Sequence, residues 1–140
     1  TPEADTWLAL DEALRLSAIE RYHESRKPHA VSPNGKLHAA AHCMVENQVA
    51  DNDPPEAGEA VDRLINEGLP RHEAIHAVGR IITAQLLTAL KGHTPFDAKG
   101  YASALQQLNR AACEAVRQQV PRHRQSGGNK KKRDRKRRGK

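Results

Sequence analysis

Two pairs of histidines in this chain have the spacing needed to bind one metal ion. His72 and His76 enclose Glu73 in the pattern His-Glu-x-x-His, and His38 and His42 form a second pair. On a helix, side chains four residues apart lie on one face. Each pair can therefore present two imidazoles to a single ion, so the spacing indicates a metal site.

Both pairs lie on the apolar faces of the helices that carry them. At about 100° per residue, His38 falls among apolar residues of its helix, and Glu46 follows within about 80°. Buried imidazoles need partners, and one ion satisfies several of them at once. The metal ligands predicted from these positions are His38, His42, Glu46, His72 and His76. Glu46 is either a fifth, anionic ligand or an acceptor that fixes an imidazole tautomer.

The predicted cofactor is a divalent metal, with zinc first and iron or manganese as alternatives. The competing interpretation is a metal-free network of hydrogen-bonded core histidines. His23 is a further candidate ligand, but its place near a helix C-terminus favours an exposed histidine that interacts with the helix dipole. His29, His93 and His123 fall in expected loops or in the C-terminal tail and carry no signal.

The His-Glu-x-x-His pattern also admits an enzyme. Glu73 would then act as the general base on a metal-bound water, which is a catalytic role. Peptidases with this motif usually bind substrate along an edge strand, and no strand is expected here. A single ion held by all four histidines would also lack an open position. Whether the protein is an enzyme stays undecided by the sequence.

The spacing of apolar residues predicts an all-α fold, an antiparallel helical bundle of four long helices and one short helix. Val and Ile are sparse and no segment alternates with a period of two, which argues against strands. The expected helices run over about residues 7–25, 37–49, 54–67, 70–92 and 97–116. Asp53 and Glu56 are expected to cap the third helix, and Gly68 and Gly92 to follow or end helices.

The charge of the chain changes sign near residue 121. Residues 122–140 hold eleven Lys and Arg against one acid, a net charge of +10, whereas residues 1–121 hold twelve against sixteen, a net charge of −4. We therefore divide the chain into a helical bundle domain, 1–121, and a flexible basic tail, 122–140. Such a tail attracts phosphates, so RNA, a ribosome or DNA is the expected partner. The expected contact residues are Lys130, Lys131, Lys132, Arg133, Arg135, Lys136, Arg137 and Arg138.

The remaining composition narrows the class of protein. No apolar run approaches the roughly 20 residues of a membrane span, so no membrane partner is expected. Cys43 and Cys113 lack a Cys-x-x-Cys neighbour, which argues against a thiolate zinc site and against a disulfide framework. A cytoplasmic location is the resulting expectation. The oligomeric state is not specified by the sequence.

Two segments resemble a small uncharacterised bacterial family described only as a domain of unknown function. They are Leu37–Gln48 and Glu67–Gly79, and the similarity extends over about residues 19–110. It implies a common unit and brings no activity with it. The function predicted from the sequence is a metal-binding helical domain with a basic tail. The alternatives are a metal-free helical adaptor on nucleic acid or ribosomes, and a small metal-dependent hydrolase.

Overall fold

The computed structural model describes residues 2–25 and 35–119, which form seven helices and no strand. The all-α fold predicted from the sequence is thus confirmed. The helices are α1 (Ala4–Leu8), α2 (Glu12–Glu24), α3 (Gly35–Asp51), α4 (Pro55–Asn66), α5 (Arg71–Gly92), α6 (Ala98–Gln107) and α7 (Arg110–Gln119). The predicted basic tail, 122–140, lies outside the described residues. None of the helices in the described ranges is long and apolar enough to cross a membrane.

Two helices that were expected to be continuous are each divided in two. Asp11 caps α2 by accepting a hydrogen bond from the Leu14 amide at 2.9 Å, after α1 has ended at Leu8. Asn109 does the same at the start of α7, accepting from the Ala112 amide at 2.9 Å. A short polar side chain that bonds the backbone two or three residues ahead favours a helix start over a helix interior. Five expected helices therefore become seven.

Of the other predicted helix ends, the two at glycines are confirmed and the one at Asp53 is not. Gly68 follows α4 with a φ of +89°, a left-handed conformation that costs glycine little. Gly92 is the last residue of α5. The cap predicted at Asp53 was wrong: α4 begins at Pro55, Pro54 is its N-cap residue, and no side chain caps the helix. The amide-free proline ring at the first helical position leaves one fewer donor to be satisfied.

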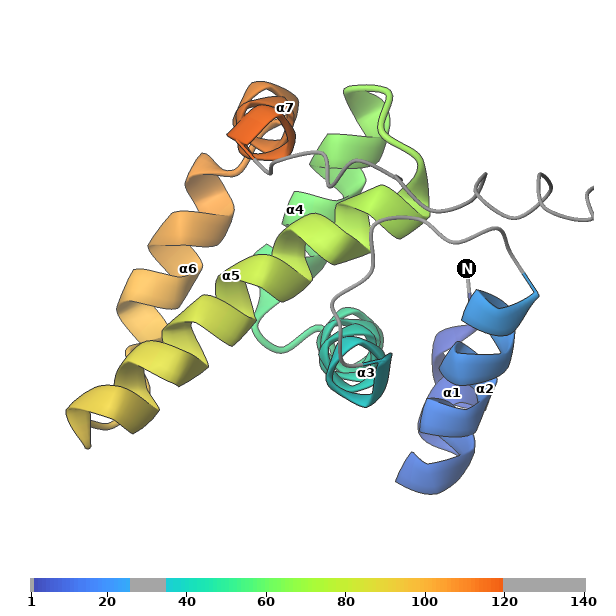
Figure 1. Ribbon diagram of the computed structural model, residues 1–140. Coiled ribbons are helices and arrows are strands. Elements are labelled where there is room, and N and C mark those ends of the chain that lie inside the picture. The colour runs from blue at the N-terminus through green and yellow to red at the C-terminus, as the bar shows by residue number, and fades with distance from the viewer. Residues whose placement is uncertain (1, 26–34, 120–140) are drawn as a thin grey trace, which may run out of the picture.

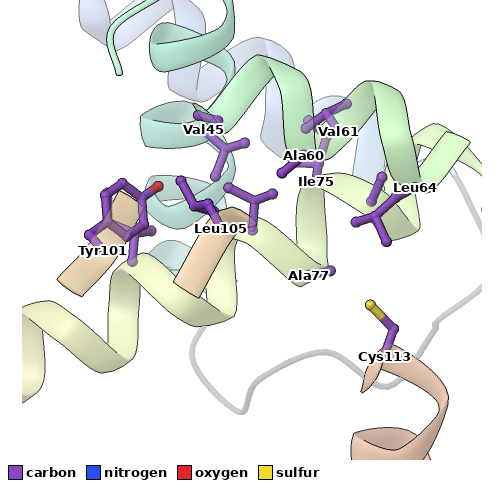
Figure 2. Packing of buried hydrophobic residues seen from close by; sticks show 13 residues of the cluster. Val45, Ala60, Val61, Leu64, Ile75, Ala77, Tyr101, Leu105 and Cys113 are labelled. Atoms are coloured by element: carbon purple, nitrogen blue, oxygen red, sulfur yellow. The ribbon is translucent and has the colours of Figure 1, made fainter. Parts of the chain in front are cut away.

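The core consists of two hydrophobic clusters. The larger cluster joins α3, α4, α5, α6 and α7, and its most completely buried large side chains include Tyr101, Leu64, Ile75 and Leu105 (Figure 2). The smaller cluster joins α1, α2 and α3 and consists of the buried residues Trp7, Ile19, Ala39 and Cys43. Helix α3 contributes to both clusters, with Val45 in the larger one, so it links the two parts of the core.

Helices α3 and α5 cross at a point where small residues face each other. Added at Gly79, a Cβ atom would lie 3.8 Å from Ala41 Cβ and 3.8 Å from Val45 Cγ2, which is ordinary contact distance. The absence of a side chain at Gly79 therefore lets α3 approach α5 closely. The antiparallel arrangement expected from the sequence does not hold for these two helices. In Figure 1, α3 is seen almost end-on while α5 extends across the view, so the helices cross.

Polar contacts attach α1 and α2 to α3. The indole Nε1 of Trp7 donates to Asn47 Oδ1 at 2.9 Å, and Arg15 donates to the same oxygen at 2.9 Å. Arg15 also donates to the carbonyl oxygens of Leu8 and Leu10 at 2.8 and 3.0 Å, across the break between the two helices. The N-terminal pair of helices is thereby fixed against the face of α3 that carries the first histidine pair.

The larger cluster should account for most of the stability of the fold. Leu64 is fully buried, whereas its neighbour Ile65 is 37% exposed. Leu64→Ala should lower the free energy of unfolding by about 2–5 kcal/mol, because it removes buried methyl groups and leaves a cavity. Ile65→Ala is the matched control and should cost well under half as much. Urea unfolding followed by circular dichroism measures both, and equal losses would contradict this core.

Candidate metal centre

Five histidine side chains from three helices converge where the two hydrophobic clusters meet. His23 comes from α2, His38 and His42 from α3, and His72 and His76 from α5. The ring centroids of His72 and His76 are 4.3 Å apart, and those of His42 and His76 are 4.6 Å apart. The two histidine pairs found in the sequence therefore face one another, as their positions on the apolar helix faces predicted.

Four of these side chains offer a set of ligand atoms suited to one ion. One ring nitrogen from each lies within 4.8 Å of all the others, and the four residues are His23, His38, His42 and His76. Two zinc–nitrogen bonds of about 2.0–2.1 Å at a tetrahedral angle hold their nitrogens about 3.4 Å apart, so an ion would draw the most widely separated rings closer by up to about 1.4 Å. His72 is not one of the four, although its ring centroid lies 4.9 Å from that of His42.

His42 lies at the centre of the cluster. It is 6% exposed, and within the described residues no hydrogen-bond partner reaches its Nε2 atom. Burial, and then the neighbouring imidazoles of His76, His38, His23 and His72, lowers the pKa of His42 from 6.5 to about 2. The ring is therefore neutral at neutral pH, which is the protonation state that binds a metal. A buried nitrogen without a partner is costly, and a cation would offset that cost.

His23 was expected to be an exposed histidine near a helix end, but the structure places it in the cluster. It does lie in the last turn of α2, but its side chain is half-buried in the cluster. Its Nδ1 atom lies 2.8 Å from the Ile19 carbonyl oxygen, which can only accept, so Nδ1 carries the proton. The neutral ring then has a lone pair on Nε2, which lies 3.0 Å from His38 Nε2. This backbone contact sets the tautomer that a metal ligand needs.

Glu46, which the sequence offered as a ligand or an acceptor for a histidine, pairs with Arg71 in the structure. Both carboxylate oxygens accept hydrogen bonds of 2.6 Å from the two terminal nitrogens of the guanidinium. The hydrogen bond to Glu46 raises the pKa of Arg71. This bidentate pair links α3 to the first turn of α5 beside the histidines, and its two charges compensate each other.

The remaining predicted residues are placed as follows. Glu73 lies half-buried in the first turn of α5 and lines neither of the two cavities that border the histidines. Cys43 is a free, buried thiol. Burial, followed by the charge of Glu12, raises its pKa, so it remains a protonated thiol and a poor ligand. The expected nucleic-acid contacts, Lys130–Arg138, are outside the described residues.

Two cavities border the cluster on different sides. The larger one, of about 580 Å³, lies between α1–α2 and α3–α5 and reaches His23, His42 and His72. The second, of about 520 Å³, lies along α3 and α5 and reaches His38, His42 and His76. His42 lines both. The centre is therefore buried in part but accessible to small molecules, an arrangement found in sites that exchange ligands.

The low pKa of His42 predicts that the metal-free protein loses stability in acid. Below pH 6.5 His42 is protonated in the unfolded chain, whereas in the folded chain it stays neutral down to about pH 2. The contribution of His42 to the free energy of unfolding is therefore constant above pH 6.5. Below that pH it falls by up to about 1.4 kcal/mol per pH unit. Urea unfolding with a chelator at pH 7.5 and pH 5 should show a loss of roughly 2 kcal/mol from this group.

The matched variant for this measurement is His42→Gln, which cannot titrate. Its unfolding free energy should depend less steeply on pH between 7.5 and 5 than that of the unaltered protein, since only the contribution of His42 is removed. The same slope in both proteins would contradict the lowered pKa. Carboxylates elsewhere titrate in both proteins and cancel in the comparison.

Comparison with other proteins places this cluster in a family. No curated protein and no solved structure matches the chain. A family model described as "Domain of unknown function" matches residues 12–107, which is more than half of the 140 residues. The match begins at α2, ends at α6 and includes all five clustered histidines. The chain therefore belongs to this family, DUF1841, as the resemblance of its two histidine segments predicted.

Proposed function

We propose that this protein is a metal-binding helical domain in which a single divalent ion is held by His23, His38, His42 and His76. The observation that carries the proposal is the convergence of four imidazole nitrogens within 4.8 Å of one another, with His42 buried among them. A metal-free network of hydrogen bonds would include the 3.0 Å contact between the Nε2 atoms of His23 and His38. It would leave the buried Nε2 atom of His42 without a partner among the described residues, and charged forms of these rings would repel one another.

The donor set favours particular metals. All-imidazole sites suit zinc, iron, copper and nickel, whereas manganese prefers carboxylate oxygen. Zinc is the first choice because neutral imidazole nitrogens are among its usual ligands and four of them match its usual coordination number. We assign Glu46 a supporting role outside the ligand set, because Arg71 occupies both of its oxygens. Glu73 as a general base remains a further proposal, tied to the hydrolase alternative.

Protein purified without a polyhistidine tag should contain close to one equivalent of zinc or iron by elemental analysis. A chelator should lower the melting temperature, because binding to the folded state alone stabilises it by about 2.7 kcal/mol at a free metal concentration of 100 times Kd. A protein that neither contains nor binds a divalent transition metal, with an unchanged melting temperature in chelator, would refute the proposal.

A matched pair of histidine variants locates the ion. His38→Asn removes one proposed ligand and should weaken metal affinity at least about 10-fold. His93→Asn alters an exposed histidine that follows α5 in a left-handed conformation, which asparagine also tolerates. It should leave metal affinity unchanged. If both variants bind metal equally well, the ion is not in the histidine cluster.

A second function, contact with nucleic acid, is favoured by the charge of residues 122–140. The net charge of +10 over nineteen residues attracts phosphates by counterion release, without reading sequence. RNA, DNA and ribosomal surface are the partners of this chemistry. If the chain is a metal-free adaptor, contact with nucleic acid is its whole function. If it binds a metal, the tail would bring the metal-binding helical domain close to nucleic acid.

Deleting residues 126–140 tests the second function. The truncated chain should keep its helicity and melting temperature and lose most of its affinity for a single-stranded RNA probe. Binding by the full chain should weaken steeply with salt, with a log–log slope of several units if several phosphates are contacted. Equal RNA binding by the truncated chain, whose charge is far lower, would exclude the tail as the contact.

A further inference from the structure

We propose that the larger cavity binds a small organic anion, a carboxylate with an apolar or aromatic body, whose head group adds a fifth ligand to the ion held by the four imidazoles. This inference rests on the proposed function and gives the site a class of ligand. Three properties of the cavity support it: its charge balance, its walls and its extra histidine.

The charge balance calls for an anion. A divalent ion held by neutral imidazoles keeps two positive charges in a largely buried site, where uncompensated charge is costly. The nearby Glu46 carboxylate is already neutralised by Arg71. The other acid that lines the cavity, Glu3, is exposed and accepts hydrogen bonds from Thr6 at the start of α1. A bound carboxylate would supply the missing negative charge.

The walls of the cavity are suited to an apolar body. Trp7 and Leu10 line one side, and Ile19 and Ile75 line others. The volume of about 580 Å³ is in the range of small-molecule pockets, roughly 300–1,000 Å³. Trp7 is held in place by its hydrogen bond to Asn47, so this wall is formed before any ligand enters. A preformed apolar wall lowers the entropic cost of binding.

His72 provides a polar contact beside the ion. It lines the larger cavity but is not among the four residues whose nitrogens converge. Its ring centroid lies 4.9 Å from that of His42 and 5.0 Å from that of His23. An imidazole at this position adds a polar group to the cavity wall beside the four converging nitrogens.

The test uses the full chain loaded with Co²⁺, whose visible spectrum reports a change in coordination. Benzoate should alter the spectrum in a saturable way, with a Kd at least 10-fold lower than that of acetate, which lacks an apolar body. Benzyl alcohol has a similar body without the charge and should cause no such change. No effect of benzoate on an established Co²⁺ spectrum overturns this inference alone. Failure of Co²⁺ to bind overturns the proposed function and this inference together.

Replacing one alanine in each cavity with phenylalanine identifies the cavity that binds the anion. Ala18 lines the larger cavity from α2, and Ala84 lines the second cavity from α5. Ala18→Phe should weaken benzoate binding at least 10-fold and leave the Co²⁺ spectrum without benzoate unchanged, whereas Ala84→Phe should change neither. Leu10→Trp, which fills the same cavity from α1's side, replaces Ala18→Phe if that variant does not fold. Loss of benzoate binding in Ala84→Phe only would assign the ligand to the second cavity and overturn the proposal.

Discussion

The close crossing of α3 and α5 is the constraint on which the rest of the structure depends. Ala41 and Gly79 leave room for the two backbones to approach, and this contact brings the histidines of both helices together. Moving one helix along the other by a single turn, about 5.4 Å, would exceed the 4.8 Å within which the ligand atoms lie. Helix α3 also enters both hydrophobic clusters, so packing on either side fixes its position.

Two features of the interior near the histidines do not favour stability. An apolar residue in place of His42 would remove a buried nitrogen that has no hydrogen-bond partner among the described residues. The Glu46–Arg71 pair likewise joins α3 to α5 through two half-buried charges. Hydrophobic side chains of similar volume in such a place are often as stabilising as an ion pair. Departures of this kind from a fully satisfied core are typical of functional sites.

Much of the fold and the site followed from local signals. Four-residue spacing on apolar faces correctly predicted that the two histidine pairs would meet. The breaks before α2 and α7 were missed because apolar periodicity continues through Asp11 and Asn109, although both are good capping residues. The roles of His23 in the cluster and of Arg71 as the partner of Glu46 were not predicted, because both depend on which helices touch. Helical spacing on α2 and α5 gives no information about a partner in α3, nor about the crossing angle of α3 and α5.

For the proposed metal site, the attachment of α1 and α2 would have a consequence for how quickly a bound ion exchanges. His23 belongs to this N-terminal pair. In the described part of the chain, the pair packs on α3 through a small cluster of four buried residues with a few partly buried side chains around them, and through the Asn47 hydrogen bonds. A small interface opens with a lower free energy than the whole molecule. Separation of this pair would withdraw His23, one of the four proposed ligands, and expose the remaining histidines to water while the larger cluster stays folded. The dissociation rate of a bound ion would then follow this local opening, and Trp7 would influence the residence time without touching the metal.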